Sequence, residues 1–141
     1  MVGGDATLPA IFLRRRNSMT IRDLLNKISK EKPNSFSEAD LISFVNEVET
    51  EVAEQLHEFE APVYTLEHDD ELDRILLAPP PYDRLYISYV KAMIDFANEE
   101  YASYQLNQEQ HVQDFRDFTD WVVRENVAGS KLPRRFRNVF H

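Results

Sequence analysis

Cysteine is absent from this chain of 141 residues, and glycine is scarce. Because there is no cysteine, neither a disulfide framework nor a thiolate metal site can form. There are three glycines, two of them adjacent at Gly3 and Gly4, so the known glycine-rich phosphate-binding loops are excluded. No apolar run approaches the roughly 20 residues that cross a bilayer. The arginines Arg14–Arg16 follow a short apolar run instead of preceding it, which is not the layout of a signal peptide.

What the sequence does contain is charge, and it is unevenly distributed. The formal net charge is -9, from 25 acidic and 16 basic side chains. Residues 37–125 hold 22 acidic and five basic side chains, whereas residues 1–36 and 126–141 each carry a net charge of +4. Nucleic-acid-binding domains usually present a basic face, so an acidic body argues against that class. The two basic ends are instead suited to an acidic partner.

The length favours a single domain with extensions at its ends. Residues 1–18 share no periodicity with the segment that follows. For them we expect either a disordered basic arm or a mis-assigned start, with Met19 as the first residue of the protein. Residues 19–126 predict the folded helical domain, and residues 127–141 predict a flexible basic C-terminal tail.

Four segments have helical periodicity, which predicts an all-α fold, a small bundle of four main helices. The first is expected to begin at Thr20 as N-cap, with Asp23 as its capping-box partner, and to end before Pro33. Its apolar stripe consists of Ile21, Leu24, Leu25 and Ile28. The second is expected to begin after Ser37, with Asp40 three positions on, and to run about five turns. Its expected buried face consists of Leu41, Phe44, Val45, Val48, Val52, Leu56 and Phe59, and its expected solvent face of Glu47, Glu49, Glu51, Glu54 and Glu58.

Residues 60–81 predict one long ordered loop, in which PVYTL is a candidate short strand and Ile75–Leu77 an apolar clip on the bundle. Loops of this length in compact domains are often functional. The third helix is expected to begin at Tyr82–Asp83, behind three prolines, and to reach Tyr104. Residues 105–110 predict a hinge before a fourth helix that Gly129 ends. The expected apolar residues of that helix are Val112, Phe115, Phe118, Trp121, Val122 and Val123, and its expected polar side carries Asp114, Asp117 and Asp120.

The segment from Pro79 to Gln108 holds five of the six tyrosines. Tyrosines on an amphipathic helix either line the core, with hydroxyls that reach a bonded partner, or form a contact with another subunit, where tyrosine is also enriched. The candidate core or subunit-interface residues are Tyr82, Tyr86, Tyr89, Met93, Tyr101 and Tyr104.

Patterns that carry catalysis or bind metals are weak. The four histidines form no strong ligand spacing, and no serine lies in a nucleophile motif. The acidic stretch Glu67–Asp73 around His68 offers hard oxygen ligands but lacks the glycine of an EF-hand loop. Paired carboxylates are present at Glu99–Glu100 and among the aspartates of the fourth helix. The polar face of any helix commonly carries such groups, so they do not indicate catalysis. We therefore predict no catalytic residue, no metal site and no cofactor, in a protein that is not an enzyme.

Two stretches of the chain, residues 19–58 and 76–126, resemble a known family. They are similar to the small head–tail connector proteins of bacteriophages and prophages, also called adaptor or head-completion proteins. The most specific part is PPYDRLYISYVKAMIDFANEEYASYQLN, in which proline and Tyr–Asp precede two aromatic turns, an alanine-containing middle, an asparagine and a last tyrosine. The resemblance spans roughly residues 19–133, and residues 1–18 have no counterpart in it.

The resemblance implies a structural virion protein of the head–tail interface, assembled in the cytoplasm of the bacterial host. It implies about twelve neighbouring copies in a homo-oligomeric ring beneath the portal protein. The ring would close the DNA-filled head, pass DNA through its lumen without specific binding, and give a platform to the next neck or stopper protein, with no membrane involved. The resemblance assigns the portal contact to the C-terminal tail, through Leu132, Arg134, Arg135, Phe136, Arg137 and Phe140.

Three alternatives stay open. Stopper and tail-completion proteins occupy adjacent layers of the same neck. A small acidic regulatory protein that binds a basic partner would have the same charge distribution. An enzyme that uses the acidic stretch and a metal is the third.

Overall fold

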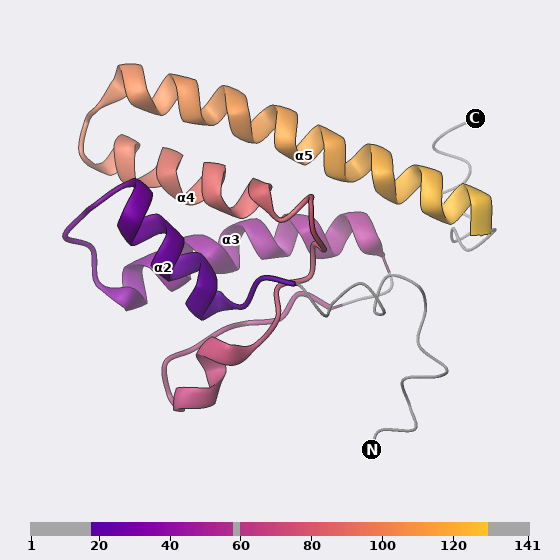
Figure 1. Cartoon of the computed structure of the whole chain (residues 1–141), viewed down its shortest axis with the longest axis horizontal. Helices are drawn as coiled ribbons and strands as arrows, with labels where there is room; N and C mark the ends of the chain where they lie inside the picture. The colour runs from indigo at the N-terminus through magenta and orange to yellow at the C-terminus, as the bar shows by residue number, and fades with distance from the viewer. Residues whose placement is uncertain (1–17, 58–59, 130–141) are drawn as a thin grey trace.

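The chain folds into α-helices joined by one long loop in the structure, which is a computed structural model (Figure 1). It describes residues 18–57 and 60–129, with the backbone alone for residues 126–129. The elements in these ranges are α2 (Ile21–Glu31), α3 (Glu38–Leu56), the short 3-10 helix η3 (Asp69–Asp73), α4 (Arg84–Ala97) and α5 (Tyr101–Gly129). The prediction of an all-α fold with four main helices is confirmed for this part of the chain.

Helix α4 lies at the centre of the arrangement. It forms an antiparallel hairpin with α5, and α2 and α3 pack against it on the other side (Figure 1). The 29-residue α5 is about twice as long as the 14-residue α4 and extends beyond the N-terminal end of α4 (Figure 1). The fully buried side chains come from all four helices and the loop, among them Ile21, Leu24, Ile28, Val45, Val48, Val52, Leu76, Leu85, Tyr86, Ile94 and Phe118. Among the described helices, none has the length and apolarity needed to cross a bilayer.

The predicted starts of the first two helices are confirmed. The Thr20 hydroxyl accepts from the backbone amide of Asp23 at 3.1 Å, and the Asp23 carboxylate accepts in return from the backbone amide of Thr20 at 3.2 Å. This capping box satisfies two donors that a helix start leaves without an intrahelical partner. At α3, the Ser37 hydroxyl accepts from the amide of Asp40 at 3.1 Å.

The long loop is ordered but contains no strand among its described residues. The expected strand around Tyr64 is wrong because its backbone bonds to a side chain instead of a neighbouring strand. The Asn46 amide accepts from the Tyr64 N–H at 2.8 Å and donates to the Tyr64 carbonyl at 3.1 Å. Further along, Thr20 and Ile75 form an isolated antiparallel bridge. The apolar clip is confirmed for Leu76 and Leu77, which are buried, whereas Ile75 lies at the surface.

The hinge predicted at residues 105–110 is wrong. The chain turns earlier, at Asn98–Glu100, and residues 105–110 lie inside α5. The turn contains neither glycine nor proline, and Glu99 adopts a left-handed backbone with φ of 60°. Backbone bonds close it, from the Asn98 amide to the Ile94 carbonyl at 3.0 Å and from the Glu100 amide to the Asp95 carbonyl at 2.9 Å. Glutamine and glutamate propagate a helix well, so the polar run Gln105–Gln110 continues α5 instead of breaking it.

Three side chains lie on the opposite face from the one predicted. Glu49 was expected in solvent but is fully buried, and Asp114 is also buried. Val112 was expected in the core but is 46% exposed. The two carboxylates follow a simple rule that buried charges are kept only where hydrogen bonds compensate for lost hydration.

Candidate functional site

The predicted tyrosine set divides into buried and exposed members. On α4, Tyr86 is fully buried, and Tyr89 and Met93 are half-buried. Tyr82, just before α4, is half-buried and stacks on Trp121, with ring centroids 5.3 Å apart. On α5, Tyr104 is half-buried and Tyr101 is 58% exposed. The structure therefore gives the core role to part of the set only. The predicted tail contacts, Leu132, Arg134, Arg135, Phe136, Arg137 and Phe140, lie outside the described residues.

Tyr86 belongs to a buried cluster around the carboxylate of Glu49, which we call the Glu49 cluster. The hydroxyls of Tyr64 and Tyr86 each donate to Glu49 at 2.5 Å, and the backbone amide of Leu77 donates to it at 2.9 Å. The Tyr86 hydroxyl in turn accepts from the amide of Ala78 at 2.8 Å. One carboxylate on α3 thus receives donors from two places on the long loop and from α4.

The local sequence explains why Glu49 points inward. It lies four residues after Val45 and three before Val52, in the middle of the apolar stripe of α3. Asn46, one turn earlier on the same helix, holds the backbone of Tyr64 and so aims that ring at Glu49. Burial, and then the charge of Glu49, raise the pKa of Tyr86 well above its ordinary value. The Tyr86 phenol therefore keeps its proton and joins α4 to α3 through its hydrogen bond to Glu49.

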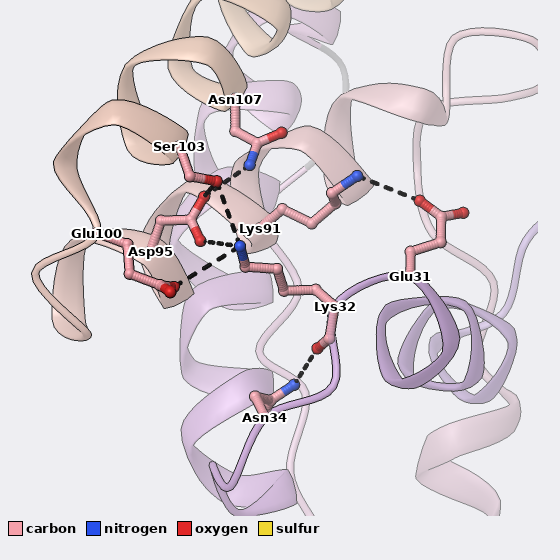
Figure 2. A network of polar contacts seen from close by, with 8 residues as sticks. All are labelled: Glu31, Lys32, Asn34, Lys91, Asp95, Glu100, Ser103 and Asn107. Atoms are coloured by element: carbon pink, nitrogen blue, oxygen red, sulfur yellow. Dashed lines mark hydrogen bonds and ion pairs between the residues drawn. The ribbon is translucent and has the colours of Figure 1, made fainter.

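A second buried carboxylate, Asp95, organises the turn between α4 and α5 (Figure 2). One of its oxygens pairs with the ammonium group of Lys32, which follows α2. The other accepts from the Ser103 hydroxyl and from the Asn107 amide, each at 2.7 Å. Lys32 also lies 3.7 Å from a carboxylate oxygen of Glu100. We call this group the Asp95 cluster, and it ties the end of α2 to both helices of the hairpin.

The electrostatics of the Asp95 cluster favour the charged forms. Burial alone would raise the pKa of Asp95, but the hydrogen bonds from Lys32, Ser103 and Asn107 outweigh it, and the pKa is lowered. The hydrogen bond to Asp95 is the main cause that raises the pKa of Lys32. An ion pair of this kind adds little net stability, since both ions lose hydration, but it defines one geometry.

A third polar group lies between α4 and α5, deeper along the hairpin. The Ser88 hydroxyl donates to the Asp114 carboxylate at 3.0 Å, and Gln110 donates to the same carboxylate at 2.9 Å. The Nδ1 atom of His111 lies 3.0 Å from the Leu85 carbonyl. Serine, histidine and aspartate are thus close together, but the serine contacts the carboxylate directly and the imidazole faces a backbone carbonyl. This arrangement suits packing more than nucleophile activation, which needs the base next to the hydroxyl.

The outer surface around the hairpin turn carries exposed aromatic rings, which we call the aromatic corner. Phe96 is 55% exposed and Tyr101 58% exposed, and Tyr104 lies beside them. The ring centroid of Phe96 is 6.2 Å from that of Tyr101 and 5.3 Å from that of Tyr104. Neighbouring exposed aromatics of this kind are uncommon on a protein surface without a partner.

The exposed side of α3 and the stretch around η3 are acidic. On α3, Glu51 has its pKa raised by partial burial and then by the neighbouring charges of Glu54 and Glu47. Tyr89 donates to Glu47 at 2.7 Å. In the stretch Glu67–Asp73, η3 forms and most side chains are exposed. Within the described residues, no three or more histidine and carboxylate side chains are grouped so as to hold a metal ion.

Comparison of the chain with protein-family models, with curated proteins and with solved structures finds no match. Any functional conclusion therefore rests on the chain's own sequence and on the geometry of its residues.

Sequence reasoning missed Glu49 and Asp95 as the centres of polar clusters. A signal existed for Glu49, because its spacing from Val45 and Val52 is that of the buried face. For Asp95 the signal was weaker, since its partners Ser103 and Asn107 lie beyond a turn that the sequence does not mark. Two residues of the aromatic corner, Tyr101 and Tyr104, were among the predicted candidates, whereas Phe96 was not.

Proposed function

We propose that this chain is a structural subunit of a phage head–tail connector, a ring beneath the portal that closes the filled head and supports neck attachment. The observation that carries the proposal is the resemblance of residues 80–107 to that family. In the structure this segment is one continuous unit, comprising the end of the long loop, α4, the turn and the first part of α5. The resemblance therefore falls on a self-contained hairpin.

The acidic surface supports the same proposal. Carboxylates of Glu47, Glu51 and Glu54 repeat along one side of α3, and more lie on η3. A wall of this charge repels phosphates, as a conduit for DNA requires. The two buried clusters support it as well, because a ring subunit must hold one shape while neighbours load it.

The test is reconstitution with the portal protein of the same phage. We expect the purified full chain to bind the portal and form a ring on it, seen by electron microscopy. The variant Arg134→Glu/Arg135→Glu/Arg137→Glu is expected to lose portal binding and keep the helical circular dichroism of the wild type. Normal portal binding by this variant would overturn the tail assignment, and absence of the wild type from the vertex of intact particles would overturn the function.

The acidic surface also favours one rival, a small regulatory protein that binds a basic partner. That reading predicts a complex of defined small stoichiometry with a basic protein and no ring on the portal. The same reconstitution, analysed by mass photometry, separates the two.

A further inference from the structure

The aromatic corner is an exposed apolar surface that the packing of the described residues leaves uncovered. Phe96, Tyr101 and Tyr104 contact one another at the outside of the α4–α5 turn. Beside them lie the exposed carboxylates of Glu99 and Glu100. Apolar rings next to acidic groups are chemically complementary to a segment that carries both aromatic and basic side chains.

The backbone on which the corner is built is tied to its surroundings. Asp95, the residue before Phe96, has a buried carboxylate that pairs with Lys32 at the end of α2 and accepts from Ser103 in the first turn of α5 (Figure 2). Glu99 keeps a left-handed backbone to close the turn. A turn whose backbone is fixed before binding loses less conformational entropy when a partner arrives, which is the usual advantage of a preorganised interface.

One segment of this chain has the matching chemistry. Residues 131–140 contain four basic side chains, no acidic one, and the apolar residues Leu132, Phe136 and Phe140. Residues 37–125, which include the corner, carry a net charge of -17, whereas residues 126–141 carry +4. The arginines can pair with Glu99 and Glu100 and stack on the rings.

Chain length decides that the contact is between copies. Gly129 lies 25 positions after Tyr104 on one continuous helix, a rise of about 38 Å at 1.5 Å per residue. From Gly129 to Arg137 there are eight residues, which span at most about 29 Å when fully extended. Arg134 and Arg135, five and six residues past Gly129, span at most about 18 and 22 Å of backbone, so they cannot reach the corner of the same chain even with their side chains extended. Arg137 could approach it only with the backbone and the side chain both fully extended. Figure 1 shows the C-terminal end of α5 at the opposite end of that helix from the α4–α5 turn.

We propose that residues 131–140 of one copy bind the aromatic corner of another copy. The contact joins two different surfaces, so it is head-to-tail and can continue from copy to copy. This inference extends the proposed function and rests on it for the existence of a ring. It names the contact that holds free copies together. The segment then has two partners, the neighbouring copy in the free protein and the portal at the vertex.

The test uses the full chain and three variants in sedimentation velocity over increasing concentration. The corner variant is Phe96→Ser/Tyr101→Ser, and the tail variant is Arg134→Glu/Arg135→Glu/Arg137→Glu. The control is Val63→Ser/Leu66→Ser, which removes two apolar side chains with exposed fractions of 67% and 44% elsewhere on the surface. We expect the wild type and the control to self-associate alike, and the corner and tail variants to weaken association at least tenfold.

Mixing the two weakened variants gives the decisive result. The corner variant keeps an intact tail and the tail variant keeps an intact corner, so an equimolar mixture should form dimers and nothing larger. A monomeric wild type, undiminished association of the corner variant, or a mixture that stays monomeric would each overturn the proposal. If the double corner substitution lowers the helical circular dichroism, Tyr101→Ser alone takes its place.

Portal binding separates this inference from the proposed function. The corner variant should bind the portal as the wild type does, because its tail is intact. Loss of portal binding by the tail variant with unchanged self-association would sink the inference and leave the function standing. Loss of self-association by both variants, with portal binding unaffected in both, would keep the inference and remove the tail from the portal contact.

Discussion

The phenol of Tyr86 and the carboxylate of Glu49 meet at 2.5 Å in the fully buried centre of the domain. One residue comes from α4 and the other from α3, and the long loop bonds to both, through Ala78 and Leu77. The pair thus fixes the loop and two helices at one point. The Glu49 cluster, the Asp95 cluster and the α4–α5 turn, on which this architecture depends, can each be tested.

Removing the carboxylate of Glu49 should strongly destabilise the fold. In Glu49→Gln an NH2 group replaces one of the two accepting oxygens and turns its hydrogens toward at least one of the three donors, so we expect a loss of about 2–4 kcal/mol in the free energy of unfolding. Urea unfolding followed by circular dichroism measures it. Glu54→Gln, an exposed change on the same helix, should stay within about 0.5 kcal/mol. Equal effects of the two variants would show that the Glu49 cluster does not hold the loop.

Alkaline pH should weaken the domain through Tyr86. Burial first, and then the charge of Glu49, raise the pKa of Tyr86 well above its ordinary value, so the folded state keeps a proton that the unfolded state releases. The stability from this group is fully present below pH about 10 and is lost as pH rises toward the folded pKa, by up to about 1.4 kcal/mol per pH unit. Unfolding free energies measured between pH about 9 and 11.5 should fall less steeply in Tyr86→Phe. Parallel slopes in the two proteins would contradict the burial of this phenol.

Breaking the Lys32–Asp95 pair should cost more than a surface ion pair does. Lys32→Met leaves the buried carboxylate with hydroxyl and amide partners but no cation, and we expect a loss of about 2–4 kcal/mol near pH 7. Lys30→Met, an exposed change in the last turn of α2, is the matched control and should change stability by less than about 0.5 kcal/mol.

The Lys32–Asp95 pair should also make the free energy of unfolding depend on pH in the acidic range. The pKa of Asp95 is lowered in the folded state, so its contribution is present above the ordinary carboxyl pKa of about 3.9 and is lost as pH falls through the folded value. Lys32→Met should therefore show a smaller loss of stability between pH about 5 and 2 than the wild type. A steeper acid transition in the variant would refute the assignment.

Glycine at position 99 should stabilise the hairpin turn. Glu99 has a φ of 60°, a region that costs a residue with a Cβ atom about 1–2 kcal/mol. Glycine avoids that cost but has more freedom in the unfolded chain, so Glu99→Gly should gain about 0.5–1 kcal/mol in thermal or urea unfolding. Glu100→Gly, beside it at the start of α5, should instead be neutral or destabilising. A loss of stability in Glu99→Gly would mean that the turn has another backbone.

Local signals in the sequence were sufficient for the helix starts. The Thr20–Asp23 and Ser37–Asp40 caps form because each side chain bonds within three residues, so nothing distant is needed to specify them. The apolar stripe of α2 was predicted equally well, because all four of its residues are buried: Ile21, Leu24, Leu25 and Ile28. The turn at Asn98–Glu100 was missed because tertiary contacts to Asp95, not a glycine or proline, end α4 there.

The polar centres of the core depend on distant partners. Glu49 was assigned to solvent because glutamate is rarely buried, and the donors that permit its burial lie 15, 28 and 37 residues away. Asp114 was assigned to solvent for the same reason, although Ser88 bonds to it from the facing helix. Identifying such residues from sequence requires knowledge of which segments meet, which periodicity alone does not supply.

The Glu49 cluster also has a kinetic meaning for the loop that follows α3. The amides of Leu77 and Ala78 donate to Glu49 of α3 and Tyr86 of α4, so we expect solvent deuterons to reach them when the loop separates from both helices. Those two amides should exchange as slowly as the helix interiors, in one cooperative unit, although they lie in a segment without regular secondary structure. A loop that looks peripheral along the chain is thereby as slow to open as the centre of the bundle.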